Sequence, residues 1–149
     1  MQQASRDPTT VTHIISGLGR GGAETPLRRL CAALGSQNVV NRVISLTGIG
    51  ALGPSLQNLG VQVTALHMSG GIRDLGRLQR LTTLLREQQP DVVQTWMYHG
   101  DLLGGIAARR AHVGQIFWNV RHSNPSHPET RLRTRLLAKA CAGLSRHIP

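Results

Sequence analysis

Residues 11–30 read VTHIISGLGRGGAETPLRRL, in which a β-branched apolar run leads into a glycine-rich turn and then into a helical pattern. The run over residues 11–16 predicts a buried strand. From Glu24 onward leucines recur at helical spacing as far as Gly35, which predicts a helix that ends there. A strand, a tight turn and a helix in this order form the first part of a crossover between parallel strands.

The same alternation continues along the chain. Further strands are predicted over residues 39–46, 61–66, 91–97 and 115–120, and helices over 54–59, 74–88, 101–112 and 129–144. Asp101 is predicted to cap the helix that it begins. The pattern predicts an α/β fold: a doubly wound, mainly parallel sheet with helices on both faces, Rossmann-like and three-layered. We expect residues 1–10 to be a disordered tail and residues 11–149 to form one domain.

The composition limits the classes of partner. The chain of 149 residues has 17 basic and 7 acidic residues, a formal net charge of +10, and all but one of the basic residues are arginine. This favours anionic ligands, nucleic acid or a membrane surface, although arginine-rich codon usage explains the charge equally well. No apolar run approaches the roughly 18 residues of a membrane span, and no signal peptide is present, so we expect a cytoplasmic protein. Cys31 and Cys141 are expected to be reduced.

The glycine turn has three interpretations. Gly17, Gly19 and Gly22 match GxGxxG, and Gly19, Gly21 and Gly22 are candidate contacts for a diphosphate at the start of a helix. A nicotinamide site would place an acid at the end of the second strand, where residues 45–48 read SLTG, so a dinucleotide is disfavoured. Alternatively, the glycines only allow close helix-to-strand packing.

Glu24 follows this turn in the first turn of the predicted helix. A carboxylate there is favourable with the helix dipole, which is nearly sufficient to explain the residue. Glu24 is also a candidate contact for a ligand hydroxyl.

Residues 96–101 read WMYHGD and follow the fourth predicted strand, at a ligand-facing end of the sheet. Aromatic rings pack on the C–H surfaces of sugars while polar groups bond hydroxyls, so Trp96 and Tyr98 are candidates for a sugar-facing wall. His99 is the candidate for a role in the reaction or in substrate binding, the alternative being an exposed loop histidine.

Arg121 and His122 follow the fifth predicted strand. They are candidates for binding an anionic group and a hydroxyl or phosphate. A metal site at His122 and His127 lacks a carboxylate or cysteine to complete it, so no metal is expected. The sequence also has no GxSxG elbow and no P-loop lysine, which disfavours hydrolases and NTPases.

Four stretches, taken together, resemble the N-terminal domain of glycosyltransferase family 4. They are SGLGRGGAE at 16–24, ISLTG at 44–48, PDVVQTWMYH at 90–99 and VRHS at 120–123. The likeness covers the chain from about Val11 onward. It departs from the family at Gln94, where many relatives have histidine, and at Pro26, where a polar helical residue is usual.

The resemblance implies the GT-B architecture, in which two Rossmann-like domains face a cleft, and metal-independent transfer of a sugar from a nucleotide-activated donor with retention at the anomeric carbon. It implies that the first domain binds the acceptor, a glycan or a lipid-linked molecule. Gly21 and Gly22 correspond to the loop that approaches the donor diphosphate, and His99 to a position near the transferred sugar. The second domain of the family has no counterpart in this sequence, so we expect this chain alone to transfer little or no sugar.

Other functions stay open on the residues alone. The chain could be a stand-alone module that binds a glycan or an anionic acceptor, or an NAD(P)-dependent reductase. The basic helix predicted over 129–144 could rest on an anionic membrane face, or simply present a solvated basic face. No nucleic-acid recognition motif is present, so nucleic acid is not an expected partner.

Overall fold

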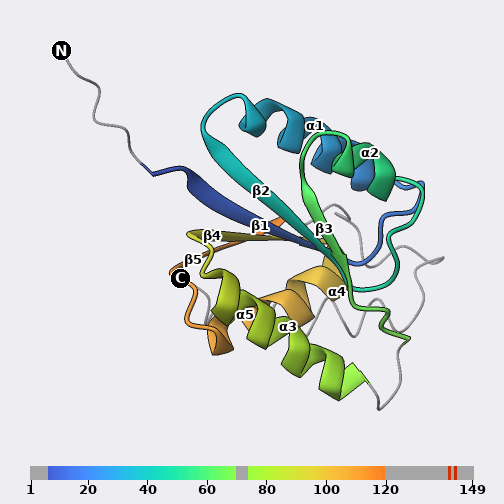
Figure 1. Ribbon diagram of the computed structural model, residues 1–149. Coiled ribbons are helices and arrows are strands. Elements are labelled where there is room, and N and C mark those ends of the chain that lie inside the picture. Colours follow the sequence, from blue (N-terminus) through green and yellow to red (C-terminus); the bar gives the residue numbers. More distant parts are fainter. Residues whose placement is uncertain (1–6, 70–73, 120–140, 142, 144–149) are drawn as a thin grey trace.

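The computed structural model describes residues 7–69, 74–119, 141 and 143. It contains a five-stranded parallel sheet of order β3-β2-β1-β4-β5 (Figure 1). The strands are β1 (Thr9–Ile15), β2 (Val39–Ser45), β3 (Gln62–Ala65), β4 (Val92–Trp96) and β5 (Gln115–Asn119). The helical elements are α1 (Glu24–Gly35), α2 (Gly53–Gln57), α3 (Asp74–Gln88), α4 (Met97–His99), the π-helical turn η1 (Gly100–Gly104) and α5 (Gly105–Arg110). The predicted α/β class and the five predicted strands are confirmed.

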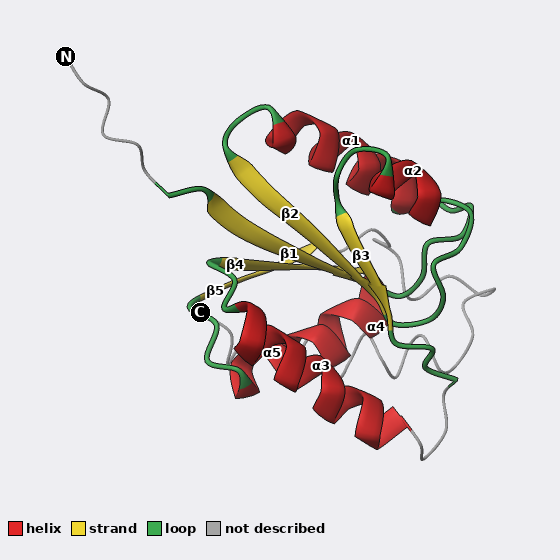
Figure 2. Ribbon diagram, viewed as in Figure 1, coloured by secondary structure: helices red, strands yellow, loops and turns green. Residues whose placement is uncertain are grey.

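Helices cover both faces of the sheet (Figure 2). Successive side chains of a strand point to opposite faces, and neighbouring residues of β1 follow this rule. Ile14 packs in a core cluster with Leu81 and Leu85 of α3, whereas Ile15 packs in a second cluster with Leu27 of α1. The fold is therefore doubly wound, and the central strand β1 has buried residues on both of its faces.

The strand order reverses between β1 and β4. The chain builds β1, β2 and β3 outward in one direction and then returns to pair β4 with the free side of β1. In open α/β sheets such a switch point opens a crevice at the carboxyl ends of the strands, where ligands bind. The glycine turn after β1 and the segment 97–101 after β4 flank this point.

The structure corrects the predicted start of the domain. β1 begins at Thr9, so residues 9 and 10, which were assigned to a disordered tail, are strand residues paired with Val39 and Val40 of β2. Two threonines next to Val11 suit a strand because β-branched side chains fit the pleated backbone. Residues 1–6 lie outside the described part.

Three further predictions concern the C-terminal helix, the two cysteines and membrane-spanning segments. The predicted helix 129–144 lies outside the described residues except for Cys141 and Gly143, which are helical. Cys31 and Cys141 are both free, as predicted. Both are buried, and burial raises the pKa of each thiol to about 11. Within the described ranges, none of the helices combines the length and hydropathy of a membrane span.

Candidate functional site

The glycine turn contains two kinds of glycine. A Cβ atom added at Gly17 would lie 2.7 Å from Thr47 Oγ1, and one added at Gly21 would lie 2.6 Å from Glu24 Oε2. Packing against Thr47 therefore accounts for Gly17, whereas at Gly21 the obstructing atoms belong to the movable end of the Glu24 side chain. Gly19 and Gly22 differ, because a Cβ at either would meet no heavy atom within 4 Å in the described structure and neither has a positive φ. Helix-to-strand packing thus leaves the glycines at 19 and 22 unexplained.

Glu24 folds back over this turn. Its Oε2 accepts a hydrogen bond of 3.1 Å from the Ala23 N–H, which satisfies one of the free donors at the start of α1. A cavity of about 350 Å³ opens beside it, which we call the loop cavity. Its described lining residues are Gly19, Arg20, Gly21, Glu24, Thr25, Ala51 and Leu52.

A second cavity, of about 420 Å³, lies at the carboxyl ends of β1, β2, β3 and β4. We call it the strand-end cavity. The described residues that line it are Ser16, Leu46, Thr47, Met68, Ser69, Asp74, His99 and Leu103. The Ser16 Oγ is buried and has no hydrogen-bond partner within the described structure, while Thr47 Oγ1 donates to the Ser16 carbonyl at 3.0 Å. The cavity therefore combines apolar walls with hydroxyl, carboxylate and imidazole groups.

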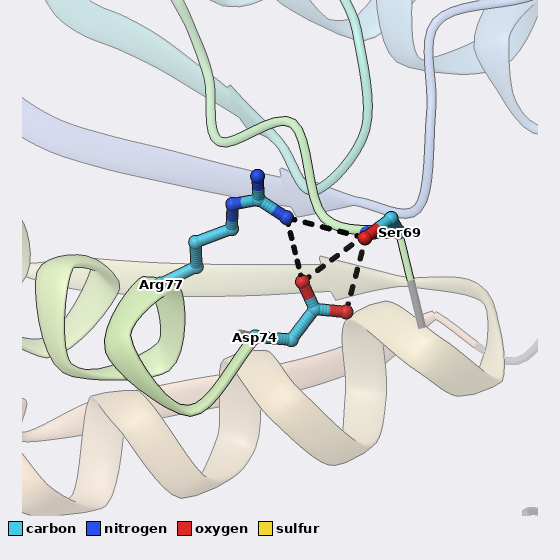
Figure 3. Close-up of polar contacts among 3 residues, drawn as sticks. All are labelled: Ser69, Asp74 and Arg77. Atoms are coloured by element: carbon cyan, nitrogen blue, oxygen red, sulfur yellow. Dashed lines mark hydrogen bonds and ion pairs between the residues drawn. The ribbon is translucent and has the colours of Figure 1, made fainter. Parts of the chain in front are cut away.

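Asp74 is held at the strand-end cavity by two neighbours (Figure 3). Its Oδ1 and Oδ2 accept from the Ser69 N–H at 3.1 and 3.2 Å, and Arg77 Nη1 pairs with Oδ1 at 2.8 Å. Arg77 Nη1 also lies 3.4 Å from Ser69 Oγ. The loop after β3 and the first turn of α3 are thus joined through one carboxylate.

The structure places His99 in this cavity. His99 ends α4, is exposed, and lines the cavity opposite residues that follow the other strands. Tyr98 is partly buried and lines neither cavity in the part of the chain that is described. Burial raises the pKa of the Tyr98 phenol, with smaller contributions from Cys141 and Asp101.

Trp96 corrects the predicted sugar-facing wall. Its side chain is only 1% exposed and packs in the core cluster on the α1 side of the sheet. The indole Nε1–H donates to His13 Nδ1 at 3.4 Å, and His13 Nε2 lies 3.2 Å from Asn41 Oδ1. This arrangement fits a neutral imidazole, and burial lowers the pKa of His13, opposed by hydrogen bonds with Asn41 and Gln94. Trp96 therefore belongs to a buried polar chain instead of a ligand surface.

Asp101 is not a helix cap, which corrects a second prediction. The helical segment begins at Met97, whose φ of 66° lies in the left-handed region that residues other than glycine rarely adopt. Asp101 lies inside η1 and is 0% exposed. Its Oδ1 accepts from Thr95 Oγ1 at 2.7 Å, and its Oδ2 has no hydrogen-bond partner within the described ranges. Burial raises the pKa of Asp101 to about 6, partly opposed by the Thr95 bond.

The remaining candidates fall into two groups. Arg121, His122 and His127 lie outside the described residues. Conversely, the structure adds polar residues that the sequence did not single out, namely Ser16, Thr47, Ser69 and Asp74 of the strand-end cavity. The rule that ligands bind at the carboxyl ends of parallel strands points to their loops, but serine, threonine and aspartate are common in any loop.

A parallel sheet of order 3-2-1-4-5, with a glycine turn at the switch point and cavities at the carboxyl edge, defines a Rossmann-like domain. The sequence model of the family described as Glycosyltransferase Family 4 matches residues 20–148, from the glycine turn almost to the end of the chain. The chain therefore belongs to glycosyltransferase family 4, as its four motifs predicted. A comparison with curated proteins found no match.

Proposed function

We propose that this domain serves a retaining glycosyltransferase that moves a sugar from a nucleotide-diphosphate donor to an acceptor, with the acceptor in the strand-end cavity. The observation that carries the proposal is the arrangement of the carboxyl edge. Ser16 lines the strand-end cavity, and Gly19, three residues later, lines the loop cavity. The two cavities are therefore neighbours, joined by one short turn of the chain. Two substrates that exchange a group need two such neighbouring sites.

The glycine turn suits the diphosphate of the donor. Gly19 and Gly22 leave open space where any other residue would place a Cβ, so a ligand can approach the backbone closely. The turn leads into α1, whose dipole and free N–H groups favour negative charge. We therefore propose that Gly19, Gly21 and Gly22 face the donor diphosphate, with Glu24 bonding a ligand hydroxyl.

We propose that His99 contacts the groups that react. It lines the strand-end cavity at the switch point, where an acceptor hydroxyl and the transferred sugar would meet. Imidazole can donate or accept a hydrogen bond near neutral pH, which suits contact with either group. We propose a reaction without metal, in which the nucleotide sugar is a substrate. A cytoplasmic location, contact with an anionic membrane and roles for Tyr98, Arg121 and His122 stay predictions.

The proposal is tested by titrating the ¹⁵N-labelled chain with UDP-glucose, UDP-N-acetylglucosamine and GDP-mannose. We expect at least one of them to shift the backbone amide signals of Gly19 and Gly22. Gly22→Ala should weaken that binding about tenfold, because the added methyl group occupies the space of the phosphate. Gly76→Ala is the matched control, since a Cβ there also meets nothing within 4 Å in the described structure.

Two results would contradict the proposal. One is that none of the three nucleotide sugars shifts the amides of the glycine turn. The other is that Gly22→Ala binds as tightly as Gly76→Ala. Binding of a glycan at the strand-end cavity without any nucleotide-sugar binding would instead favour a glycan-binding module, and binding of NADH at the turn would favour a reductase.

A further inference from the structure

Among the described residues that line the strand-end cavity, Asp74 is the one that carries a formal charge. The Asp74 side chain is 18% exposed. Of the two partners in this ion pair, Asp74 lines the cavity, whereas Arg77 is not among the described lining residues.

A carboxylate selects its ligand by hydrogen-bond type. An ionised carboxylate accepts hydrogen bonds and donates none, so a ligand group next to Asp74 has to be a donor. A sugar hydroxyl meets this condition. An ionised ligand carboxylate or phosphate does not, because it also brings a second negative charge to within a few ångströms.

The rest of the cavity fits the same kind of ligand. Leu46, Met68 and Leu103 supply apolar walls for the C–H surface of a ring. The buried Ser16 hydroxyl, which has no partner in the described structure, can exchange hydrogen bonds with a ligand hydroxyl. A volume of about 420 Å³ lies within the usual range for small-ligand sites.

We propose that Asp74 makes the strand-end cavity selective for a neutral, hydroxyl-bearing sugar over an anionic one. Arg77 is a positioning residue. Its bond to Oδ1, together with the Ser69 N–H, holds the carboxylate at the cavity wall and partly offsets its charge. The inference rests on the proposed function, since it names the class of acceptor that this cavity takes.

The two members of the ion pair predict opposite effects. Asp74→Asn keeps an oxygen for the Ser69 N–H but removes the negative charge, so the neighbouring Arg77 then attracts an anionic ligand. Arg77→Gln leaves Asp74 without its cation, so an anionic ligand is repelled more strongly. Loss of folding cannot imitate this pattern, because it weakens the binding of neutral and anionic ligands alike.

The experiment uses the full chain and pairs of sugars that differ at one carbon. The probes are methyl glucoside with methyl glucuronide, and methyl galactoside with methyl galacturonide, titrated by NMR at neutral pH while the amides of Leu46, Thr47 and Ser69 are followed. We expect the neutral member of a pair to bind about tenfold more tightly than its uronate, because Arg77 offsets much of the repulsion between the two negative charges. Asp74→Asn should remove that preference, and Arg77→Gln should enlarge it.

Glu87→Gln is the matched control, because it removes one exposed negative charge near the other end of α3 and should leave the preference unchanged. The inference is overturned if the uronates bind as tightly as the neutral glycosides, if Asp74→Asn behaves like Glu87→Gln, or if no glycoside shifts the cavity amides. Its failure is distinct from that of the proposed function, which is measured with nucleotide sugars at Gly19 and Gly22.

Discussion

Replacing Asp101 with asparagine removes a negative charge from the interior of the domain without changing the size of the side chain. Asp101 is 0% exposed, and its one described hydrogen bond comes from Thr95 Oγ1 at 2.7 Å. The asparagine oxygen can accept the same bond. The variant therefore isolates the effect of ionisation at this position.

The magnitude follows from the pKa. Burial raises the pKa of Asp101 from its usual 3.8 to about 6. Since a tenfold change in proton binding is worth about 1.4 kcal/mol, ionised Asp101 destabilises the folded state by about 3 kcal/mol relative to its neutral form. The folded carboxyl holds its proton more tightly than the unfolded one. Its stabilising contribution is thus complete below pH 3.8 and is lost as the pH rises through about 6.

The assay is urea unfolding of the wild-type chain and Asp101→Asn at about pH 4 and about pH 8. At each pH we take the unfolding free energy of the variant minus that of wild type. We expect this difference to be about 2–3 kcal/mol larger at pH 8 than at pH 4. Comparing the two conditions cancels any constant penalty for burying the asparagine amide where Oδ2 has no described partner. It also cancels the titration of His13, which both chains share.

The reasoning is refuted if the difference in unfolding free energy between variant and wild type is the same at both pH values. That result would mean that the Asp101 carboxyl titrates alike in the folded and unfolded chains, and so is not desolvated. Unchanged backbone amide signals around Thr95 in the folded variant would show that the comparison is between like structures.

Two further predictions concern packing and the buried histidine. A Cβ at Gly104 would lie 2.9 Å from Thr95 Cγ2, so Gly104→Ala should lower the unfolding free energy by about 1–3 kcal/mol. Gly76 lies in a helix and a Cβ there meets no obstruction, so Gly76→Ala should raise the unfolding free energy by up to about 1 kcal/mol. Both changes are measured from the midpoints of urea unfolding. The pKa of His13 is lowered by burial, so the unfolded chain protonates first as the pH falls below 6.5. As the pH falls below about 6.5, the unfolding free energy of wild type should therefore decrease relative to that of His13→Gln, by at most about 1.4 kcal/mol per pH unit. The prediction is wrong if the unfolding free energies of the two chains change in parallel with pH.

Much of the fold can be predicted from local sequence patterns. The strands coincide with short runs rich in β-branched or aromatic residues, and β1 differs from its prediction by the two threonines at its start and by Ser16 at its end. Helix α3 ends at its predicted residue, Gln88, because Pro90 prevents its continuation. Such signals depend on neighbouring residues and can be read without the tertiary structure.

The candidate site was predicted only in part, because its details depend on distant contacts. Trp96 ends a strand, and its ring is buried in the core, where it contacts His13 of the neighbouring strand. The helix after β4 begins four residues before the predicted cap, at Met97, which adopts a positive φ that no sequence pattern signals for methionine. Asp74 gains its place in the strand-end cavity from the fold of the loop after β3.

The π-helical turn η1 has a consequence for how the chain can vary in evolution. A π turn holds one residue more than an α turn, so it rotates everything after it by about 100° relative to a regular helix. Residues before η1 reach the strand-end cavity with His99, while Ala107 and Ala108 after it are buried against the sheet. Deletion of a single residue between positions 100 and 104 would bring these two faces out of phase, although every remaining side chain was kept. The number of residues in this segment is therefore constrained independently of which residues they are. A percentage of identical residues between relatives does not measure this constraint.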